Sequence, residues 1–264
     1  MNDLVRLERE GGVARVTLAR PEAGNAVNLE LAQQLQEVAN ACASDPGIRS
    51  VLLSAEGKAF CVGGDLSAFA AVQGDARTAL LQTMADTFHA AQLQFLTMPK
   101  PVVVSVQGAV AGAGLGLALI GDLVVAGSGA HFTSAYTAVG LSADGGSTFL
   151  LPRLIGMRRA QQLLLTDRRL TAVEALDWGL VTEIVEPGAL DDHAARRARA
   201  FANGPTAAYG AIRRLLLTSL ASDFASQTDE EGRQIARLAA GPDASEGFAA
   251  FLAKRPAIFS GADA

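Results

Sequence analysis

The chain has 264 residues, half of them hydrophobic, and a formal net charge of −5. This length is enough for one large domain or two small ones with a sizeable core. The negative charge disfavours a nucleic-acid partner, because phosphate backbones bind basic surfaces. The two cysteines and three histidines are scattered and form no disulfide framework or metal-ligand pattern. The opening MNDLVRLEREGG lacks the apolar run of a signal peptide, so we expect a cytoplasmic, metal-free protein.

As far as about Arg153, predicted strands alternate with predicted helices. In chain order we expect strands at 5–10, 13–20, 49–57, 101–106 and 122–127, and helices at 28–43, from about 65, at 77–96 and at 111–120. The first two strands meet at Gly11-Gly12 and are expected to form a hairpin. Such alternation implies a largely parallel β/α core.

The glycine-rich segment 106–122, VQGAVAGAGLGLALIGD, has three possible interpretations. The uncharged run 101–121 is long enough for a membrane helix, but Pro101 and five glycines interrupt it, so we reject a membrane partner. Its G-x-G-x-G spacing is not the G-x-G-x-x-G of a dinucleotide site. A β-branched strand leading into a glycine-lined helix start leaves backbone N–H groups free. That arrangement suits an anion or an oxygen on which charge develops.

Beyond Arg153 the composition turns helical. We expect helices at 157–166, 171–179, 188–204 and 205–220, with two more before Phe251. A break near Phe201 separates the strand-rich part from a helical tail, so we expect two regions, 1–200 and 201–264.

Several segments in order resemble the consecutive signatures of the crotonase (enoyl-CoA hydratase/isomerase) superfamily. They are KAFCVGGDL, KPVVVSVQGAVAGAGLGLAL, FTSAYTAVGLSADGGSTFLLPRLIG, LTAVEALDWGLV and, in the tail, FLAKRPAIF. The resemblance implies an α/β fold, a crotonase-like spiral of ββα units with a C-terminal helical region. It places a CoA-thioester site in 1–200 and a trimerisation region in 201–264. The implied assembly is a homotrimer or a dimer of trimers.

The same resemblance implies an acyl-CoA substrate of the kind used in fatty acid metabolism, with no cofactor besides the coenzyme A of the substrate. In the family, two backbone N–H groups hold the thioester carbonyl and stabilise the enolate. Their positions map to Val62 and Ala113 in this sequence. Each such donor typically contributes ~10²–10³ in rate. This oxyanion site is the function that the glycine-rich segment is expected to serve.

Hydratases of the family use two glutamates, which map here to Gly116 and Tyr136, so hydration by the usual route is disfavoured. Asp144 is the remaining candidate acid and base, because a single carboxylate can carry a proton between two carbons. We therefore favour isomerisation of an enoyl-CoA double bond. The alternative for Asp144 is a helix cap, since it precedes Gly-Gly-Ser-Thr and an apolar run.

Three other functions remain open: an enoyl-CoA hydratase, a hydrolase resembling 4-chlorobenzoyl-CoA dehalogenase, and a catalytically silent binder of CoA thioesters. Phe60, His89 and Asp144 fall where that dehalogenase has functional residues, while Tyr136 replaces its pocket tryptophan. The alternative for His89 is a structural role in its helix.

The resemblance also implies contacts around the substrate. The positions assigned to the acyl group are Phe60, His89, Gly112, Gly116 and Tyr136. Those assigned to coenzyme A are Arg20, Lys58, Cys61, Asp65, Leu66 and Lys254, the last acting across a subunit interface. Considered singly, Asp65 is expected to cap its helix and Cys61 to be a small buried residue.

Overall fold

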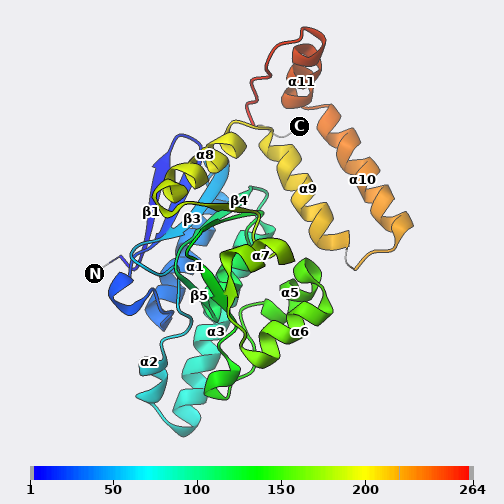
Figure 1. Ribbon diagram of the computed structural model, residues 1–264. Helices are drawn as coiled ribbons and strands as arrows, with labels where there is room; N and C mark the ends of the chain where they lie inside the picture. The colour runs from blue at the N-terminus through cyan, green and yellow to red at the C-terminus, as the bar shows by residue number, and fades with distance from the viewer. Residues whose placement is uncertain (1–2, 220, 262–264) are drawn as a thin grey trace.

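The computed structural model describes residues 3–219 and 221–261 (Figure 1). Leu220, the last residue of the helix predicted at 205–220, lies outside the described residues. The strands are β1 Val5–Glu10, β2 Val13–Leu18, β3 Ser50–Ala55, β4 Val102–Val106, β5 Ala109–Ala111, β6 Leu123–Gly127, β7 His131–Thr133, β8 Leu170–Thr171 and β9 Glu183–Val185. The helices are η1 Pro21–Ala23, α1 Leu29–Ser44, α2 Leu66–Ala70, α3 Gly74–Thr97, α4 Ala113–Leu119, η2 Thr137–Val139, α5 Ser147–Ile155, α6 Met157–Thr166, α7 Ala172–Trp178, η3 Pro187–Ala189, α8 Leu190–Ala202, α9 Thr206–Ser219, α10 Phe224–Ala239 and α11 Pro242–Leu252.

Six strands form the main sheet in the order β1-β2-β3-β4-β6-β9. Within this sheet β1 and β2 pair antiparallel, as a hairpin turning at Gly11, whose φ is +58°. Every other neighbouring pair in this sheet is parallel. Parallel sheets are buried on both faces, which explains why every residue of β4 is buried. The expected hairpin and the largely parallel core are therefore confirmed.

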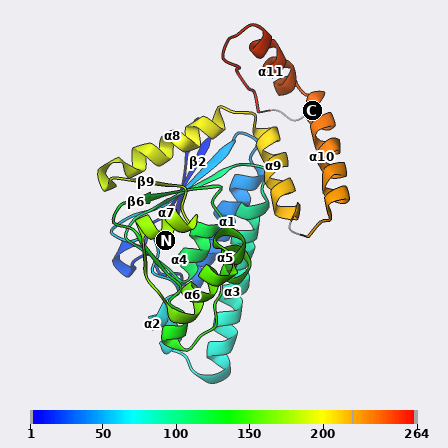
Figure 2. The same cartoon turned by 45° about the vertical axis from the view of Figure 1, so that its right-hand side comes forward.

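Alternate residues of each strand face opposite sides of this sheet. On one face Leu52, Val103 and Val125 pack against the apolar side of α8. On the other face Val51, Leu53 and Val104 belong to the large core that includes residues of α1, α3 and α4. The helices therefore cover both faces, as Figure 2 shows.

A second, smaller sheet has the order β5-β7-β8. β5 follows β4 after Gly108, and this glycine lies so close to Lys58 that a Cβ there would be 1.9 Å from the Lys58 carbonyl oxygen. β5 then runs directly into α4 through Gly112, whose φ is +50°. The start of α4 is thereby fixed by two sheets at once.

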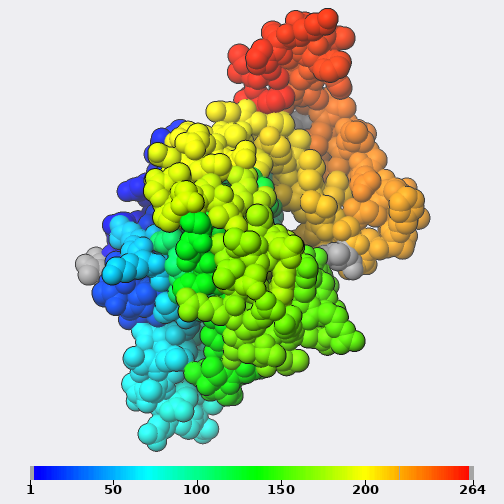
Figure 3. All heavy atoms as spheres, in the orientation of Figure 1, coloured from blue at the N-terminus to red at the C-terminus, as the bar shows by residue number. Residues whose placement is uncertain are grey.

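Helices α9, α10 and α11 form an arm that projects from the sheet and its covering helices (Figures 1 and 3). Arg213 of α9 ties the arm's base to the core, through an ion pair of 2.8 Å with Asp122 and a hydrogen bond of 3.0 Å to the Phe95 carbonyl. Large apolar side chains on and after the arm's helices are strongly exposed, including Phe224 at 85% and Phe251 at 83%. The expected boundary between residues 200 and 201 falls inside α8, which packs on the sheet.

Within the described residues, none of the helices combines the length and the apolar character needed to cross a membrane.

Candidate active site

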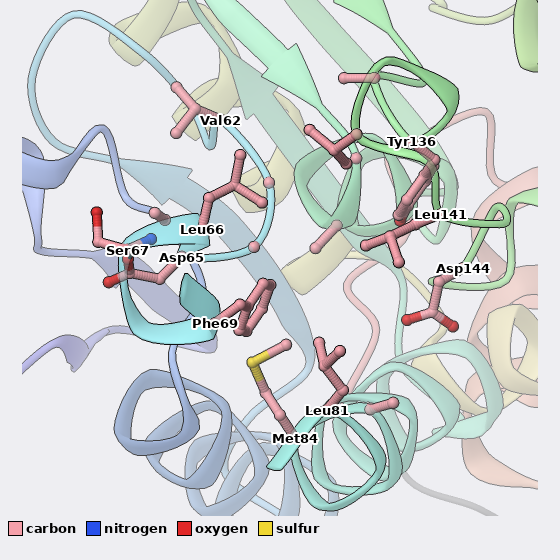
Figure 4. Close-up of a pocket in the computed structure, with 18 of the residues that line it drawn as sticks. Val62, Asp65, Leu66, Ser67, Phe69, Leu81, Met84, Tyr136, Leu141 and Asp144 are labelled. Carbon is pink, nitrogen blue, oxygen red and sulfur yellow. Dashed lines mark hydrogen bonds between the residues drawn. The ribbon is translucent and has the colours of Figure 1, made fainter. Parts of the chain in front are cut away.

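A cavity of about 770 Å³ opens between the segment 62–67 with α2 on one side and α3 with the segment 135–144 on the other. Figure 4 shows Val62, Asp65 and Leu66 facing Tyr136 and Asp144 across this space. The lining residues are Arg20, Ala23, Ala26, Val62, Gly63, Gly64, Asp65, Leu66, Ser67, Phe69, Thr78, Leu81, Gln82, Met84, Ala85, Gly112, Ala113, Ala135, Tyr136, Val139, Leu141, Ser142 and Asp144. The cavity is therefore mainly apolar, with carboxylates contributed only by Asp65 and Asp144 among these residues.

Two backbone segments meet at one end of the cavity because glycines allow close contact. Cys61 forms a parallel bridge with Val110, and a Cβ on Gly112 would lie 3.3 Å from the Gly63 Cα. A Cβ on Gly114 would lie 2.3 Å from the Cys61 carbonyl oxygen. No larger residue fits at Gly114 without separating the segments. The glycine-rich run thus serves to bring backbone against backbone.

The amide of Val62 is not available to a ligand, because it donates a hydrogen bond of 3.1 Å to the Gly24 carbonyl. The assignment of Val62 as an oxyanion donor is therefore wrong. The nearby Gly64 forms a parallel bridge with Val27, in which the Val27 N–H donates to the Gly63 carbonyl and the Asp65 N–H donates to the Val27 carbonyl. No described residue accepts a hydrogen bond from the Gly64 N–H. Ala113 begins α4, so its N–H likewise has no partner within the described chain.

Asp144 lies in the connection between η2 and α5 and is paired with His89 of α3. The Nε2 atom of His89 lies 2.7 Å from Oδ1 of Asp144, and each side chain is 44% exposed. The N-cap of α5 is Gly146, and within the described chain α5 has no side-chain cap hydrogen bond. The helix-cap interpretation of Asp144 is therefore wrong. Asp144 lines the cavity, whereas His89 supports it from outside the lining set.

The two positions that carry glutamates in the resembled hydratases have very different surroundings. Gly116 is buried, and a Cβ there would lie 2.4 Å from the Gly145 carbonyl oxygen, so a side chain has no room. Tyr136 lines the cavity, but its buried hydroxyl has no hydrogen-bond partner among the described residues. Burial is the main cause that raises the Tyr136 pKa, so the phenol stays protonated.

Asp65 caps α2, as expected, with Oδ1 accepting hydrogen bonds of 3.1 Å from the Ser67 N–H and 3.2 Å from the Ala68 N–H. Its other oxygen forms an ion pair of 2.8 Å with Arg20. Burial tends to raise the Asp65 pKa, but the hydrogen bonds from Arg20 and the two backbone N–H groups outweigh it and lower the pKa. Arg20 and Asp65 therefore neutralise each other at the cavity wall.

The other positions assigned to coenzyme A or the acyl group are more dispersed. Leu66 lines the cavity and is 52% exposed. Phe60 and Cys61 are fully buried and do not line it, and burial raises the pKa of the Cys61 thiol to about 12. Lys58 is exposed outside the cavity. Lys254 follows α11, at the opposite end of the molecule from α2 (Figure 1).

The sequence analysis missed Gln92, which is 6% exposed and donates a hydrogen bond of 3.0 Å to the Gly145 carbonyl. The sequence feature that could have indicated Gln92 is its position three residues after His89, which places both side chains on the same face of one helix. The apolar wall formed by Phe69, Leu81 and Met84 was also missed. Among the described residues, no cluster of three or more His, Cys, Asp or Glu side chains could hold a metal ion.

Comparisons with known proteins show which family and which solved structures the chain is similar to. The family model described as enoyl-CoA hydratase/isomerase matches residues 8–262. The 1,2-epoxyphenylacetyl-CoA isomerase of Escherichia coli is 36% identical, covering 99% of this chain and all of that protein. The trans-2-decenoyl-[acyl-carrier-protein] isomerase of Streptococcus mutans is 34% identical over 96% of each chain. The crystal structure of an enoyl-CoA hydratase from Polaromonas sp. JS666 superposes with a TM-score of 0.92 at 34% identity, covering 97% of this chain and 99% of that one.

Proposed function

The chain belongs to the enoyl-CoA hydratase/isomerase family, and we propose that it shifts the double bond of an enoyl-CoA thioester with Asp144 as acid and base. The crotonase fold expected from the sequence is confirmed, as is the acyl-CoA class of enzyme. The observation that supports the proposal is that Asp65 and Asp144 are the carboxylates among the residues that line the cavity. Asp65 is held by Arg20, so Asp144 is the cavity's available proton carrier.

Binding begins at the backbone. In this proposal the Gly64 and Ala113 N–H groups donate to the thioester carbonyl oxygen, and they strengthen their hold as the oxygen gains charge. The acyl group then lies against the apolar wall of Phe69, Leu81 and Met84. Coenzyme A is part of the substrate, and the proposed reaction needs no other cofactor.

Asp144 then removes a proton from C2 of a 3-enoyl-CoA, and the electron pair moves into a dienolate held by the two amides. The carboxylic acid formed on Asp144 returns that proton to C4, which gives the 2-enoyl-CoA and restores the carboxylate. His89 holds one carboxylate oxygen in place throughout. The step needs neither water nor a second acid.

Hydration is disfavoured because water has no carboxylate pair to position and deprotonate it. Gly116 has no room for a side chain, and the protonated Tyr136 hydroxyl is buried. The His89–Asp144 pair does favour one alternative, hydrolysis resembling that of 4-chlorobenzoyl-CoA dehalogenase. A catalytically silent binder is the remaining alternative, and a cytoplasmic location stays a prediction.

We also propose that the protein assembles as trimers or as dimers of trimers. Lys254 follows α11, which lies at the opposite end of the molecule from α2 (Figure 1), so its expected contact with coenzyme A requires a neighbouring subunit. The exposed apolar side chains of the arm supply the surface for such contacts.

The test is Asp144→Asn with 3-enoyl-CoA, 2-enoyl-CoA and 4-chlorobenzoyl-CoA as substrates and identification of each product. Asparagine keeps the size of the side chain, and the Asp144 backbone carbonyl still accepts the 2.7 Å hydrogen bond from the Ser147 hydroxyl. We expect a folded variant that binds CoA thioesters and loses at least ~10² in isomerase kcat. Faster hydration than isomerisation in the parent, or unchanged kcat in the variant, would refute the proposal.

A further inference from the structure

Two side chains of α3 hold the connection that carries Asp144. His89 reaches the Asp144 carboxylate at 2.7 Å, and Gln92 donates to the next carbonyl, that of Gly145, at 3.0 Å. The two contacts differ in environment: His89 is 44% exposed, whereas Gln92 is 6% exposed. The Gln92 hydrogen bond is thus shielded from competing water, which makes it the firmer of the two ties.

The space for this arrangement comes from Gly116 of α4. A Cβ on Gly116 would lie 2.4 Å from the Gly145 oxygen and 3.0 Å from Nε2 of Gln92. The hydrogen-bonded pair therefore occupies the volume in which any side chain at position 116 would begin. Glycine at 116 is a requirement of the Gln92–Gly145 contact.

Tyr136 and Phe88 enclose the same connection from other directions. A Cβ on Gly145 would lie 3.7 Å from the Tyr136 hydroxyl and 3.6 Å from a ring carbon of Phe88. Gly145 itself has a φ of +62° and Gly146 one of +70°. Two consecutive glycines have wide conformational freedom, so Asp144 is fixed only as well as its neighbours are held.

We propose that Gln92 is a positioning residue for Asp144, and that Gly116 and Tyr136 complete a seat for the Asp144–Gly146 connection. Gly116 and Tyr136 stand where the resembled hydratases carry glutamates. In this proposal both residues help to hold Asp144, the carboxylate that acts in place of those glutamates. The expected effect on kcat rests on the proposed function of Asp144. The seat itself is a property of the fold and can be tested without turnover.

The first experiment measures kcat and KM for Gln92→Leu, with Gln94→Leu as the matched control on the same helix. Gln92→Leu keeps an apolar stem in the buried space and removes the donor to Gly145. We expect kcat to fall about 10- to 100-fold with KM within about twofold of the parent, because Asp144 is misplaced while thioester contacts remain. Gln94→Leu should match the parent. An unchanged kcat, or an equal fall in both variants, would overturn the positioning role.

Gln92→Glu separates the hydrogen bond from packing. A neutral glutamic acid can donate to the Gly145 carbonyl, whereas the ionised form cannot. The ratio of its kcat to that of the parent should therefore rise as the pH falls from about 8 to about 5, since burial raises a carboxyl pKa. His89, Asp144 and Tyr136 also face this seat. They are present in both the variant and the parent, so taking the ratio of the two kcat values controls for them. A ratio independent of pH would contradict the inference.

Amide hydrogen exchange of the peptide covering residues 142–149 provides the readout without turnover. Exchange should accelerate in Gln92→Leu and not in Gln94→Leu. If exchange accelerates but the parent is no isomerase, the proposed function fails and the seat stands. If exchange is unchanged in Gln92→Leu, the seat is refuted whatever the reaction is.

Discussion

The contact between Gly114 and Cys61 makes Gly114→Ala a direct test of the oxyanion site. A Cβ at position 114 would lie 2.3 Å from the Cys61 carbonyl oxygen and 2.6 Å from its Cβ. An ordinary contact begins at 3.4 Å, so α4 and the segment 61–64 must move apart by about 1 Å. Ala113 and Gly64 lie on opposite sides of that contact, so their amides would separate by a similar distance.

We expect Gly114→Ala to lower kcat about 10²-fold, since a displacement of about 1 Å is enough to misplace a reacting group. Overpacking should also lower the free energy of unfolding by about 1–3 kcal/mol. The assay is isomerase turnover of a 3-enoyl-CoA, with folding checked by circular dichroism and urea unfolding.

Gly129→Ala is the matched control, because a Cβ at position 129 meets nothing within 4 Å and the substitution should leave kcat unchanged. A folded Gly114→Ala variant with the parent's kcat would refute the reasoning. Either the close contact would then be unnecessary, or the two amides would not stabilise the enolate.

Asp65→Asn keeps the cap on α2 but removes the charged partner of Arg20, whose side chain is only 19% exposed, so it should cost about 1–3 kcal/mol of unfolding free energy at pH 7. Because folding lowers the pKa of Asp65, the parent's extra free energy of unfolding is complete above the ordinary pKa of 3.8. It should shrink as the pH falls through the lower folded-state pKa. Urea unfolding that gives the same difference between parent and variant at every pH would contradict this. Light scattering at micromolar concentration should show trimers or hexamers, because Phe224 and Phe251 expose 85% and 83% of their surface in a single chain. A monomer at that concentration would contradict the assembly.

The longer elements of the fold were predictable from the sequence, and the shortest were not. Strands β3 and β4 are short runs rich in valine and leucine, and α3 was expected within a few residues of its observed bounds, Gly74–Thr97. Strands of two or three residues, such as β8 and β9, are too short for an alternating pattern to emerge. Their pairing is set by the larger structure around them.

The candidate site divides in the same way. Asp144 and Ala113 could be located from motifs, but the choice between Val62 and Gly64 could not. That choice depends on which way each N–H points, and Gly63, with a φ of +109°, turns the chain between the two residues. The pairing of His89 with Asp144 joins residues 55 positions apart, and the Gln92 contact joins residues 53 apart. The spacing of His89 and Gln92 places both on one face of α3, but local pattern does not show which distant residues that face contacts.

The position of Asp144 on a connection has a consequence for protein engineering. Gly64 lies in a backbone bridge with Val27, and Ala113 begins α4 directly after β5, whereas residues 142–146 belong to no strand or helix. Substitutions in this connection are therefore expected to change the proposed acid–base group with little disturbance to the proposed thioester contacts. A variant library confined to these positions, with Gln92 and Gly116 retained, is a compact starting point for selecting a different reaction on the same class of substrate.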